Sequence, residues 1–273
     1  MQVVTVEGTG MARTGILRVA GSRVRMVLAV LAGLLAMALP VRAASAEGNW
    51  QFIIEPYVYM GSLDGNAAIG RAEGDIDADF SDLLKNLKIA AMLNAEVTND
   101  RWGIIGDVQY MKLGLKKEFS GDRFAELSSK MTIFETEAFY RWHLGERATL
   151  DALAGIRYWN IRMYADLSGP IINPSARRAA DWVDPVIGAR LIVPLTERLL
   201  FRLRGDIGGF GVGSSFSWQI FAGFVYDVSK SFAVTLSYRY LDADYSRGAP
   251  NTPERFVFDA AMHGPQLGFK FTF

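Results

Sequence analysis

The sequence contains no cysteine among its 273 residues. It therefore has no disulfide framework, no thiolate metal site and no cysteine for a lipoprotein anchor. Only two histidines occur, His143 and His263, and the formal net charge is zero. That balance excludes a basic nucleic-acid-binding domain. The hydrophobic content of 50% is ample for a folded core and unlike that of a disordered chain.

Charge is spread unevenly, because five arginines and one acid, Glu7, precede residue 44. The apolar run "MVLAVLAGLLAMAL" follows Arg25, and the small residues "ASA" stand at 44–46. This layout predicts a cleaved secretory signal peptide over residues 1–46 and a mature domain over 47–273. The alternative is an uncleaved anchor, although 14 apolar residues are fewer than the roughly 20 that a spanning helix needs. The basic region is long, so the true start codon could also be Met11 or later.

Beyond residue 47 no apolar run reaches 18 residues, and the recurring pattern is alternation of polar and apolar residues. Alternation with a period of two is typical of β-strands with two different faces. Most of the segments reach the 9–11 residues of a tilted membrane strand, whereas ordinary globular strands average five or six. The pattern predicts ten strands, at 50–60, 88–98, 101–115, 130–143, 148–165, 182–195, 198–209, 215–228, 231–244 and 255–273.

The connections between these strands alternate between tight turns and longer loops. The short ones are "ND", "LGER", "TE" and "SK", and most of the others are far longer. Outer-membrane barrels have short periplasmic turns and longer outer loops. We therefore predict an all-β fold, a closed antiparallel up-and-down transmembrane β-barrel of ten strands, with eight or twelve as alternatives. A soluble barrel of lipocalin type would show the same alternation with its faces exchanged.

The two registers of each strand predict which face meets lipid. Apolar and aromatic residues such as Phe201 and Leu203 occupy one register, and the aromatic ones gather near strand ends, as in interfacial girdles. The other register contains seven acids and seven bases, which we assign to the lumen: Glu55, Glu96, Asp107, Glu135, Glu137, Asp184 and Asp206, with Arg141, Arg157, Arg190, Arg202, Arg204, Arg239 and Lys270.

A ten-stranded barrel is narrow, so these lumen charges should pair and fill it. A charge-paired, plugged lumen indicates an envelope structural or surface-binding protein. The alternative is a narrow passive channel for small solutes, or a small-ligand pocket. Equal numbers of acids and bases argue against strong ion selectivity, which rings of one sign would give.

The first long connection contains "DIDADFSDLLKNL". Its opening acids resemble a calcium loop, but Phe80 and Asn86 stand where an EF-hand needs glycine and glutamate, so we expect no metal. Ser81 could cap a short helix whose apolar residues are spaced as on one helical face. This segment either folds into the barrel mouth as a plug or begins the next strand. The residues of the possible plug are Phe80, Leu83, Leu84 and Leu87.

The C-terminal "GPQLGFKFTF" resembles the last strand of bacterial outer-membrane β-barrel proteins, whose terminal aromatic residue is recognised by the barrel-assembly machinery. This resemblance assigns the assembly signal to Phe273. The segments "RWGIIGDVQY", "DWVDPVIGAR" and "RGDIGGFGVGSSFSW" are similar to those of an uncharacterised family of proteobacterial outer-membrane barrels. The resemblance implies a barrel in the cell outer membrane, with outer-membrane lipid and lipopolysaccharide as partners. Arg177 and Arg178 could meet lipopolysaccharide phosphates. We favour a monomer.

The sequence offers no clear catalytic group, and we expect neither an enzyme nor a cofactor. Ten strands also resemble the omptin proteases, which use acids and a histidine at the outer rim. His143 is expected at the periplasmic end and His263 near the middle of the last strand, so neither suits such a site. A lipid-A deacylase would place a serine beside the histidine, but Pro265 occupies the second position after His263. A lipid- or peptide-hydrolysing enzyme is therefore the third alternative.

Overall fold

The computed structural model describes residues 50–119, 123–145, 147–168 and 175–273. The predicted signal peptide over residues 1–46 lies outside this part of the chain. None of the helices in the described residues is long and apolar enough to cross a membrane.

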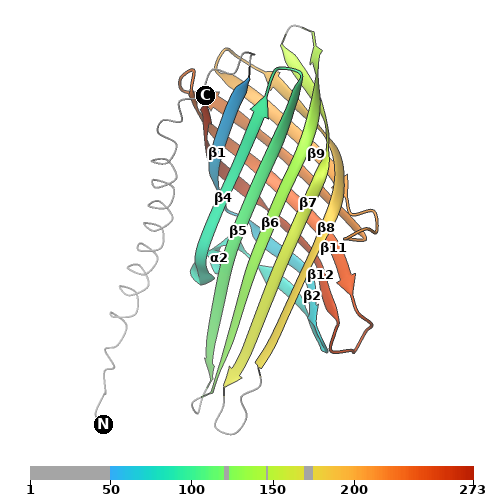
Figure 1. The fold of residues 1–273 in the computed structure, drawn as a ribbon. Coiled ribbons are helices and arrows are strands. Elements are labelled where there is room, and N and C mark those ends of the chain that lie inside the picture. The colour runs from blue at the N-terminus through green and yellow to red at the C-terminus, as the bar shows by residue number, and fades with distance from the viewer. Residues whose placement is uncertain (1–49, 120–122, 146, 169–174) are drawn as a thin grey trace, which may run out of the picture. The chain divides into compact units, whose positions relative to one another are not determined.

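The described chain is almost entirely strand, with one short helix (Figure 1). Every pairing between neighbouring strands is antiparallel. In chain order the elements are β1 (Gln51–Tyr59), β2 (Ser62–Ile69), β3 (Ala72–Ala78), α2 (Phe80–Asn86), β4 (Leu87–Thr98), β5 (Trp102–Phe119), β6 (Arg123–Leu144), β7 (Ala148–Ser168), β8 (Ser175–Pro194), β9 (Leu199–Gly208), β10 (Phe216–Asp227), β11 (Phe232–Arg247) and β12 (Phe256–Thr272).

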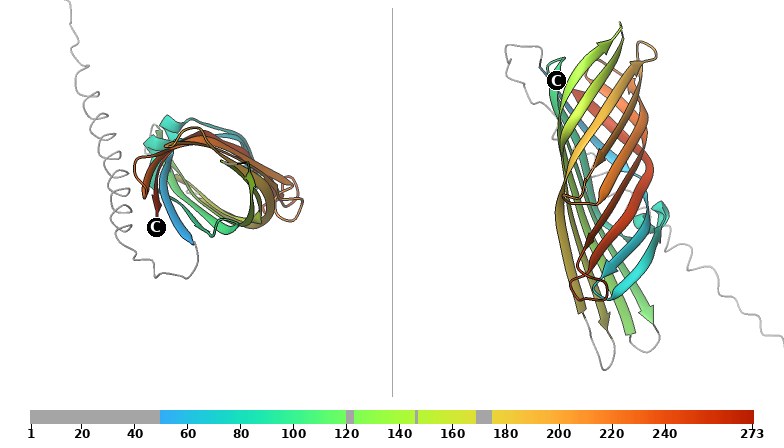
Figure 2. Two further views of the ribbon diagram at one scale, coloured as in Figure 1. Left: turned by 90° about the horizontal axis from the view of Figure 1, so that it is seen from above. Right: turned by 90° about the vertical axis from the view of Figure 1, so that its right-hand side faces the viewer.

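Ten strands close into a barrel, which appears as a ring when viewed from above (Figure 2). β1 pairs with both β4 and β12, and consecutive strands from β4 to β12 pair with one another. These ten correspond to the ten predicted strands. Links at 99–101, 145–147, 195–198 and 228–231 define one end of the barrel, which we call the turn end; the opposite end is the loop end.

Several predicted loops are strand in the structure. β5 and β6 continue to a link of only three residues, 120–122, and β7 and β8 are also longer than predicted. The first long connection contains a hairpin, β2–β3, that the sequence analysis did not foresee. Acidic and glycine residues are poor strand formers, so "LDGN" and "AEGDIDA" gave no strand signal.

The added hairpin continues the wall beside the last strand. β1 pairs with Gln266–Thr272 of β12, whereas β2 pairs with its other half, Phe256–His263. Gly264 lies opposite the break between β1 and β2. A Cβ atom there would come 2.5 Å from the Met60 carbonyl oxygen, so this approach requires glycine.

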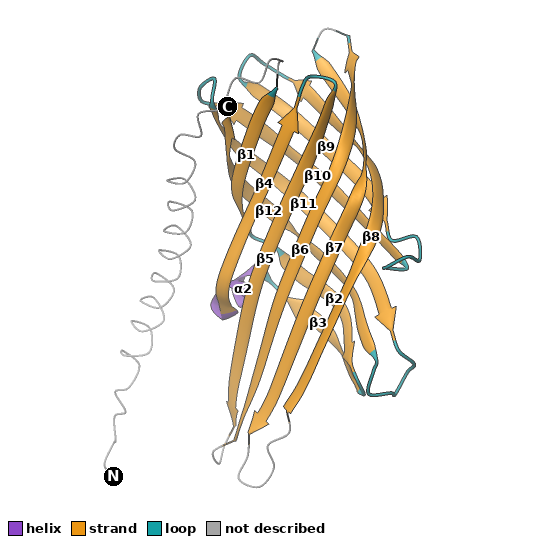
Figure 3. Ribbon diagram, in the orientation of Figure 1, coloured by secondary structure: helices purple, strands orange, loops and turns teal. Residues whose placement is uncertain are grey.

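Near the loop end the wall has a seam, formed by β3, α2 and the Leu113–Phe119 part of β5. β3 pairs only with β2, and the β4–β5 ladder begins at Leu87 and Leu113. α2 lies against β2, β3 and β5, on the side of the barrel (Figure 3). Within the described residues, helix packing replaces strand pairing along this seam.

α2 begins at Asp79, whose carboxylate accepts a hydrogen bond of 2.9 Å from the Asp82 backbone N–H. The prediction that Ser81 caps the helix is therefore wrong. Asp79 has the extended backbone of a capping residue, at φ −71° and ψ 165°, whereas Ser81 lies inside the first turn.

The outer surface of the barrel is apolar, as the strand registers predicted. Trp102, Ile104, Ile187 and Leu236 each expose more than half of their area. A soluble barrel of lipocalin type would turn these side chains inward. The protein is therefore a transmembrane β-barrel, with its apolar face toward lipid.

The interior has two layers. The charged layer, nearer the turn end, contains the acids and bases of the lumen register. The apolar layer, nearer the loop end, was not foreseen by the sequence analysis, which assigned polar and charged residues to the lumen. Its larger members are Tyr59, Met92, Met131, Ile133, Trp159, Ile161, Trp182, Leu241, Tyr245, Phe256, Phe258 and Met262.

Candidate functional site in the barrel lumen

The centre of the charged layer is a group of acids held by two arginines. Arg157 on β7 is fully buried, and its Nη2 lies 2.5 Å from Glu135 Oε2 and 2.6 Å from Asp206 Oδ1. Arg204 on β9 contacts Glu135 and lies 2.7 Å from Glu137 Oε2. Because β6 and β9 are not neighbours in the sheet, Arg204 joins strands across the interior.

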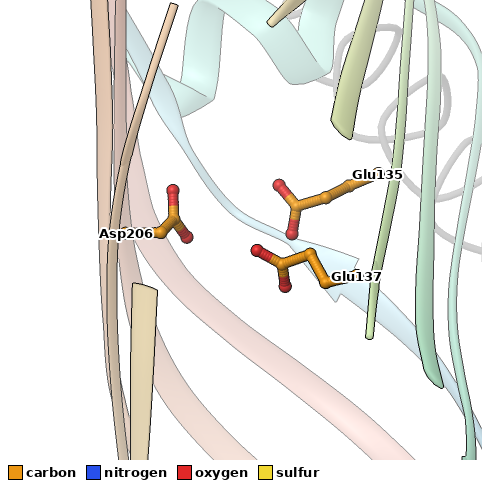
Figure 4. A group of neighbouring side chains, drawn as sticks. All are labelled: Glu135, Glu137 and Asp206. Atoms are coloured by element: carbon orange, nitrogen blue, oxygen red, sulfur yellow. The ribbon is translucent and has the colours of Figure 1, made fainter. Parts of the chain in front are cut away.

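The carboxylates of Glu135, Glu137 and Asp206 point toward one another across the lumen (Figure 4). Their oxygens lie within 4.8 Å of one another, a spacing that would also suit a metal ion. Here the guanidinium groups of Arg157 and Arg204 already supply the positive charge. The group is therefore best described as a buried ion-pair cluster, in which the three carboxylates share the two guanidinium groups.

A second group of ion pairs lies nearer the turn end. Arg190 on β8 reaches across the lumen to Glu96 on β4, with Nη1 2.6 Å from Oε2. Its Nη2 also lies 2.7 Å from Asp151 on β7, which Arg141 contacts at the same distance. The sequence analysis missed Asp151, although this residue shares the inward register of Arg157 and is completely buried.

A third group joins β1 and β5 to the opposite wall. Arg202 lies 3.2 Å from Glu55, which also accepts a 2.7 Å hydrogen bond from the Thr235 hydroxyl. Arg239 lies 3.4 Å from Asp107. The Tyr57 hydroxyl donates a 2.9 Å hydrogen bond to Asp107, within reach of the same arginine.

Two residues assigned to the charge network have no ionic partner among the described residues. Lys270 forms no ion pair in this part of the chain. Asp184 accepts hydrogen bonds from the Trp159 indole at 3.0 Å and from the Ser214 backbone N–H at 2.6 Å. Asp184 therefore anchors the Gly-rich link between β9 and β10. Within this link Ser214 is fully buried, whereas Phe210 and Val212 are exposed.

The apolar layer contains a group of stacked aromatic rings. Trp182 stacks on Tyr245 with ring centroids 3.9 Å apart, and Trp159 stacks on its other side at 5.5 Å. Phe258 packs against both tryptophans. The inward face of the strands is therefore aromatic at this level, in contrast to the charged layer.

The described part of the barrel contains two partly open spaces in its interior. One lies in the charged layer, with about 490 Å³ of space free of atoms, part of it open to solvent, and Glu55, Asn94, Asp107 and Arg202 among its lining residues. The other lies beneath α2 at the seam, with about 510 Å³, also partly open. We call the second space the seam pocket, and almost all of its lining is apolar.

The residues of the possible plug line the seam pocket. Phe80, Leu83 and Leu84 belong to α2, and Leu87 begins β4, so the segment is both a helix and the start of a strand. All four are only partly buried. They lie at the seam, where Met92, Met131 and Met262 of the apolar layer line the same pocket.

The histidines occupy different surroundings. His143 lies at the turn end, where its Nε2 is 3.2 Å from Asp100. His263 lies in the lipid-facing register of β12, with Nε2 2.8 Å from Asp64 and Nδ1 3.0 Å from the Tyr238 hydroxyl. Ser62 stands opposite His263 in the β2–β12 register, but no hydrogen bond between their side chains occurs. Both ring nitrogens already have partners, so the geometry does not activate a serine nucleophile.

Phe273 closes the chain against β1. Its backbone N–H donates a 2.8 Å hydrogen bond to the Phe52 carbonyl, and its own carbonyl accepts from Phe52. The terminal residue thus continues the β1–β12 ladder. Its recognition by the assembly machinery stays a prediction.

Comparison with known proteins identifies the fold. No family model matches the sequence, and no curated protein matches it. The structure is similar to that of the outer membrane protease OmpT from Escherichia coli, with a TM-score of 0.54, 10% identity, and coverage of 86% of this chain and 100% of OmpT. At that identity the similarity extends to the fold alone.

Weaker similarities involve other outer-membrane barrels. The translocator domain of the autotransporter NalP from Neisseria meningitidis has a TM-score of 0.41 and 11% identity, covering 90% of this chain and 96% of that domain. Ail, the attachment invasion locus protein of Yersinia pestis, has a TM-score of 0.36 and 14% identity, covering 83% of this chain and 99% of Ail.

Proposed function

We propose that this protein is a passive integral protein of the outer membrane, with a closed lumen and a structural or surface-binding role in the envelope. The observation that supports the proposal is the packing of side chains inside the barrel. Ion pairs such as Arg190–Glu96 join non-neighbouring strands across the charged layer, and stacked rings fill the apolar layer. A solute would have to displace both layers to cross the barrel.

The two layers block different solutes. Breaking a buried ion pair leaves a charge without its partner, which costs about 3–5 kcal/mol, so the charged layer resists thermal opening. The apolar layer offers no hydrogen bonds to water or to an ion that leaves the charged layer. In this proposal, the space in the charged layer, whose lining does not include Trp159 or Trp182, does not continue through the apolar layer.

Planar-bilayer conductance tests this proposal. We expect no current from the purified wild-type barrel and none after deletion of residues 80–87, since the apolar layer lies deeper than α2. The control is the double variant Trp182→Ala/Tyr245→Ala, which removes two of the stacked rings. If the apolar layer blocks the barrel, this variant should conduct more readily than the wild type. A steady ohmic current from the wild type would contradict the proposal.

The second candidate is a narrow passive channel, which the space in the charged layer favours. Its lining by both acids and arginines would give little ion selectivity. The same recordings separate the two functions, because a channel conducts without any substitution in the apolar layer.

An outer-membrane hydrolase is the third possibility. The fold similarity to OmpT brings no activity to this chain, and the hydroxyl group that His263 contacts belongs to Tyr238 rather than to a serine. Replacing His263 by alanine is expected to leave any lipid hydrolysis by the purified protein unchanged.

A further inference from the structure

On the outer face of β5, β6 and β7, the side chains change from mainly apolar to polar and then to basic in successive rows toward the loop end. Strand register places Val108, Phe134 and Tyr158 directly opposite one another. The next outward row is Tyr110, Thr132 and Asn160, and the following one is Lys112, Lys130 and Arg162. We call the last three residues the basic row.

The alternation of buried neighbours shows that the basic row faces outward. Met131 and Ile161, which adjoin Lys130 and Arg162 in sequence, belong to the apolar layer inside the barrel. Met111, beside Lys112, packs against the same layer. The three cations therefore project from the opposite side of the wall, where the membrane and its headgroups lie.

The position along the strands matches the edge of the hydrocarbon region. Apolar side chains continue toward the turn end from Phe134, which exposes 40% of its area, to Trp142. Residues 134–142 match the 9–11 residues that a tilted membrane strand needs. The basic row begins just beyond an amphipathic row containing Tyr110, as expected at the level of lipid phosphates.

The cations of the basic row have no acidic partner among the described residues. In this part of the chain, none of the three side chains forms an ion pair or a hydrogen bond. Asp181 on β8 stands opposite Asn160 rather than opposite Arg162, and makes no ion pair with it. Like charges directly opposite on neighbouring strands are destabilising, so an anion from outside the chain would relieve their repulsion.

The basic row continues toward the loop end with Arg177 and Tyr164. The Arg177 guanidinium lies over the Tyr164 ring at 5.0 Å, and the Lys130 ammonium lies 5.8 Å from the same ring. Tyr164 thus orients two cations on one side of the wall. Arg177 was predicted from the sequence to meet lipopolysaccharide phosphates, but its proximity to Tyr164 and Lys130 was not predicted.

We propose that Lys112, Lys130 and Arg162, extended by Arg177, form a binding site for the phosphate groups of an anionic glycolipid of the lipopolysaccharide type. This inference rests on the proposed location in the outer membrane. A lipid is the occupant rather than free phosphate, because the cations border the apolar band in which acyl chains would lie. Arginine and lysine bind phosphate through charge-assisted hydrogen bonds that strengthen next to hydrocarbon.

The test measures binding of purified lipopolysaccharide to the full barrel in a non-ionic detergent. The variant Lys112→Gln/Lys130→Gln/Arg162→Gln is compared with Arg101→Gln/Arg147→Gln/Lys230→Gln, which removes the same charge from exposed positions at the turn end. We expect the first variant to bind roughly a hundredfold more weakly than wild type, and the second to bind as wild type does.

Two further arms identify the ligand. Lipopolysaccharide treated with a phosphatase should bind wild type as weakly as the basic-row variant does, and inorganic phosphate should not compete at equal concentration. Equal binding by both triple variants, equal binding of dephosphorylated lipid, or full competition by inorganic phosphate would each overturn the inference.

A fold control separates this inference from the proposed function. Each variant must migrate on a detergent gel as a heat-modifiable barrel before its binding is compared. Wild-type protein that is soluble without detergent would contradict the membrane location itself. A correctly folded barrel without phosphate-dependent binding would contradict the lipid site alone.

Discussion

Arg190 on β8 and Glu96 on β4 meet across the lumen, with Nη1 2.6 Å from Oε2 and with both side chains almost fully buried. Three strands, β5, β6 and β7, separate β4 from β8 along the sheet. The pair therefore acts as a crosslink through the interior, and its energy depends on both charges being present.

Arg190→Met is expected to destabilise the barrel by about 3–5 kcal/mol, because Glu96 would keep a buried charge without its main partner. The double variant Arg190→Met/Glu96→Gln should recover part of this loss. Urea unfolding followed by tryptophan fluorescence measures both values. The control Arg147→Met, at an exposed position, should change stability by less than about 0.5 kcal/mol. Equal stability of the Arg190 and Arg147 variants would show that the crosslink contributes nothing.

Leu236→Arg tests which face meets lipid. Leu236 exposes 55% of its area in the apolar band on β11, and an arginine there should cost about 2–4 kcal/mol in a lipid bilayer. Val212 is more exposed, at 75%, but lies in the link between β9 and β10. Val212→Arg should therefore leave stability in lipid vesicles unchanged. The reverse order of the two effects would place water, not lipid, around β11.

Gly103→Val tests close packing inside the wall. A Cβ atom at Gly103 would lie 2.3 Å from the ring of Phe139, which covers this glycine. The ring is buried and cannot move away freely, so we expect a loss of about 1–3 kcal/mol from overpacking. Gly74→Val is the matched control, since no atom lies within 4 Å of the corresponding Cβ position. Differential scanning calorimetry in detergent would compare the two.

Asp79→Ala tests the cap of α2. Removal of the carboxylate that accepts from Asp82 should weaken the helix by about 1 kcal/mol. Hydrogen exchange of the α2 amides should become correspondingly faster, while exchange in β6 and β7 stays unchanged. Ser81→Ala, one step inside the helix, should have little effect. A larger acceleration in the Ser81 variant would assign the cap to Ser81 after all.

The strand registers were predictable because polar and apolar residues alternate along the sequence with a period of two. Phe201 and Leu203 alternate with Arg202 and Arg204, and that contrast defines two faces without any knowledge of distant contacts. The inward position of Asp151 could have been predicted in the same way, since this residue shares the register of Arg157.

The apolar layer was harder to predict because both faces of the strands are apolar there. Around Trp159 and Trp182 the inward side chains are as hydrophobic as lipid-facing ones, so polarity no longer distinguishes lumen from membrane. The inward face of this layer can be recognised only by counting every second residue along the strand from a lumen residue such as Arg157 or Asp184. The β2–β3 hairpin could not be predicted because its stability comes from pairing with β12, nearly 200 residues further along the chain.

The shared use of β12 by β1 and β2 also constrains the order of folding. Ile53 of β1 pairs with Thr272 of β12, and Ile69 of β2 pairs with Phe256 of β12. The first two described strands therefore both pair with the last one. Before β12 has been synthesised, β1 and β2 each have a strand edge without its pairing partner. Unpaired strand edges favour association with other chains. Contacts of such sequence separation form slowly. We therefore expect closure of the ring to be a late step in folding, before which these strand edges have no pairing partner in the chain.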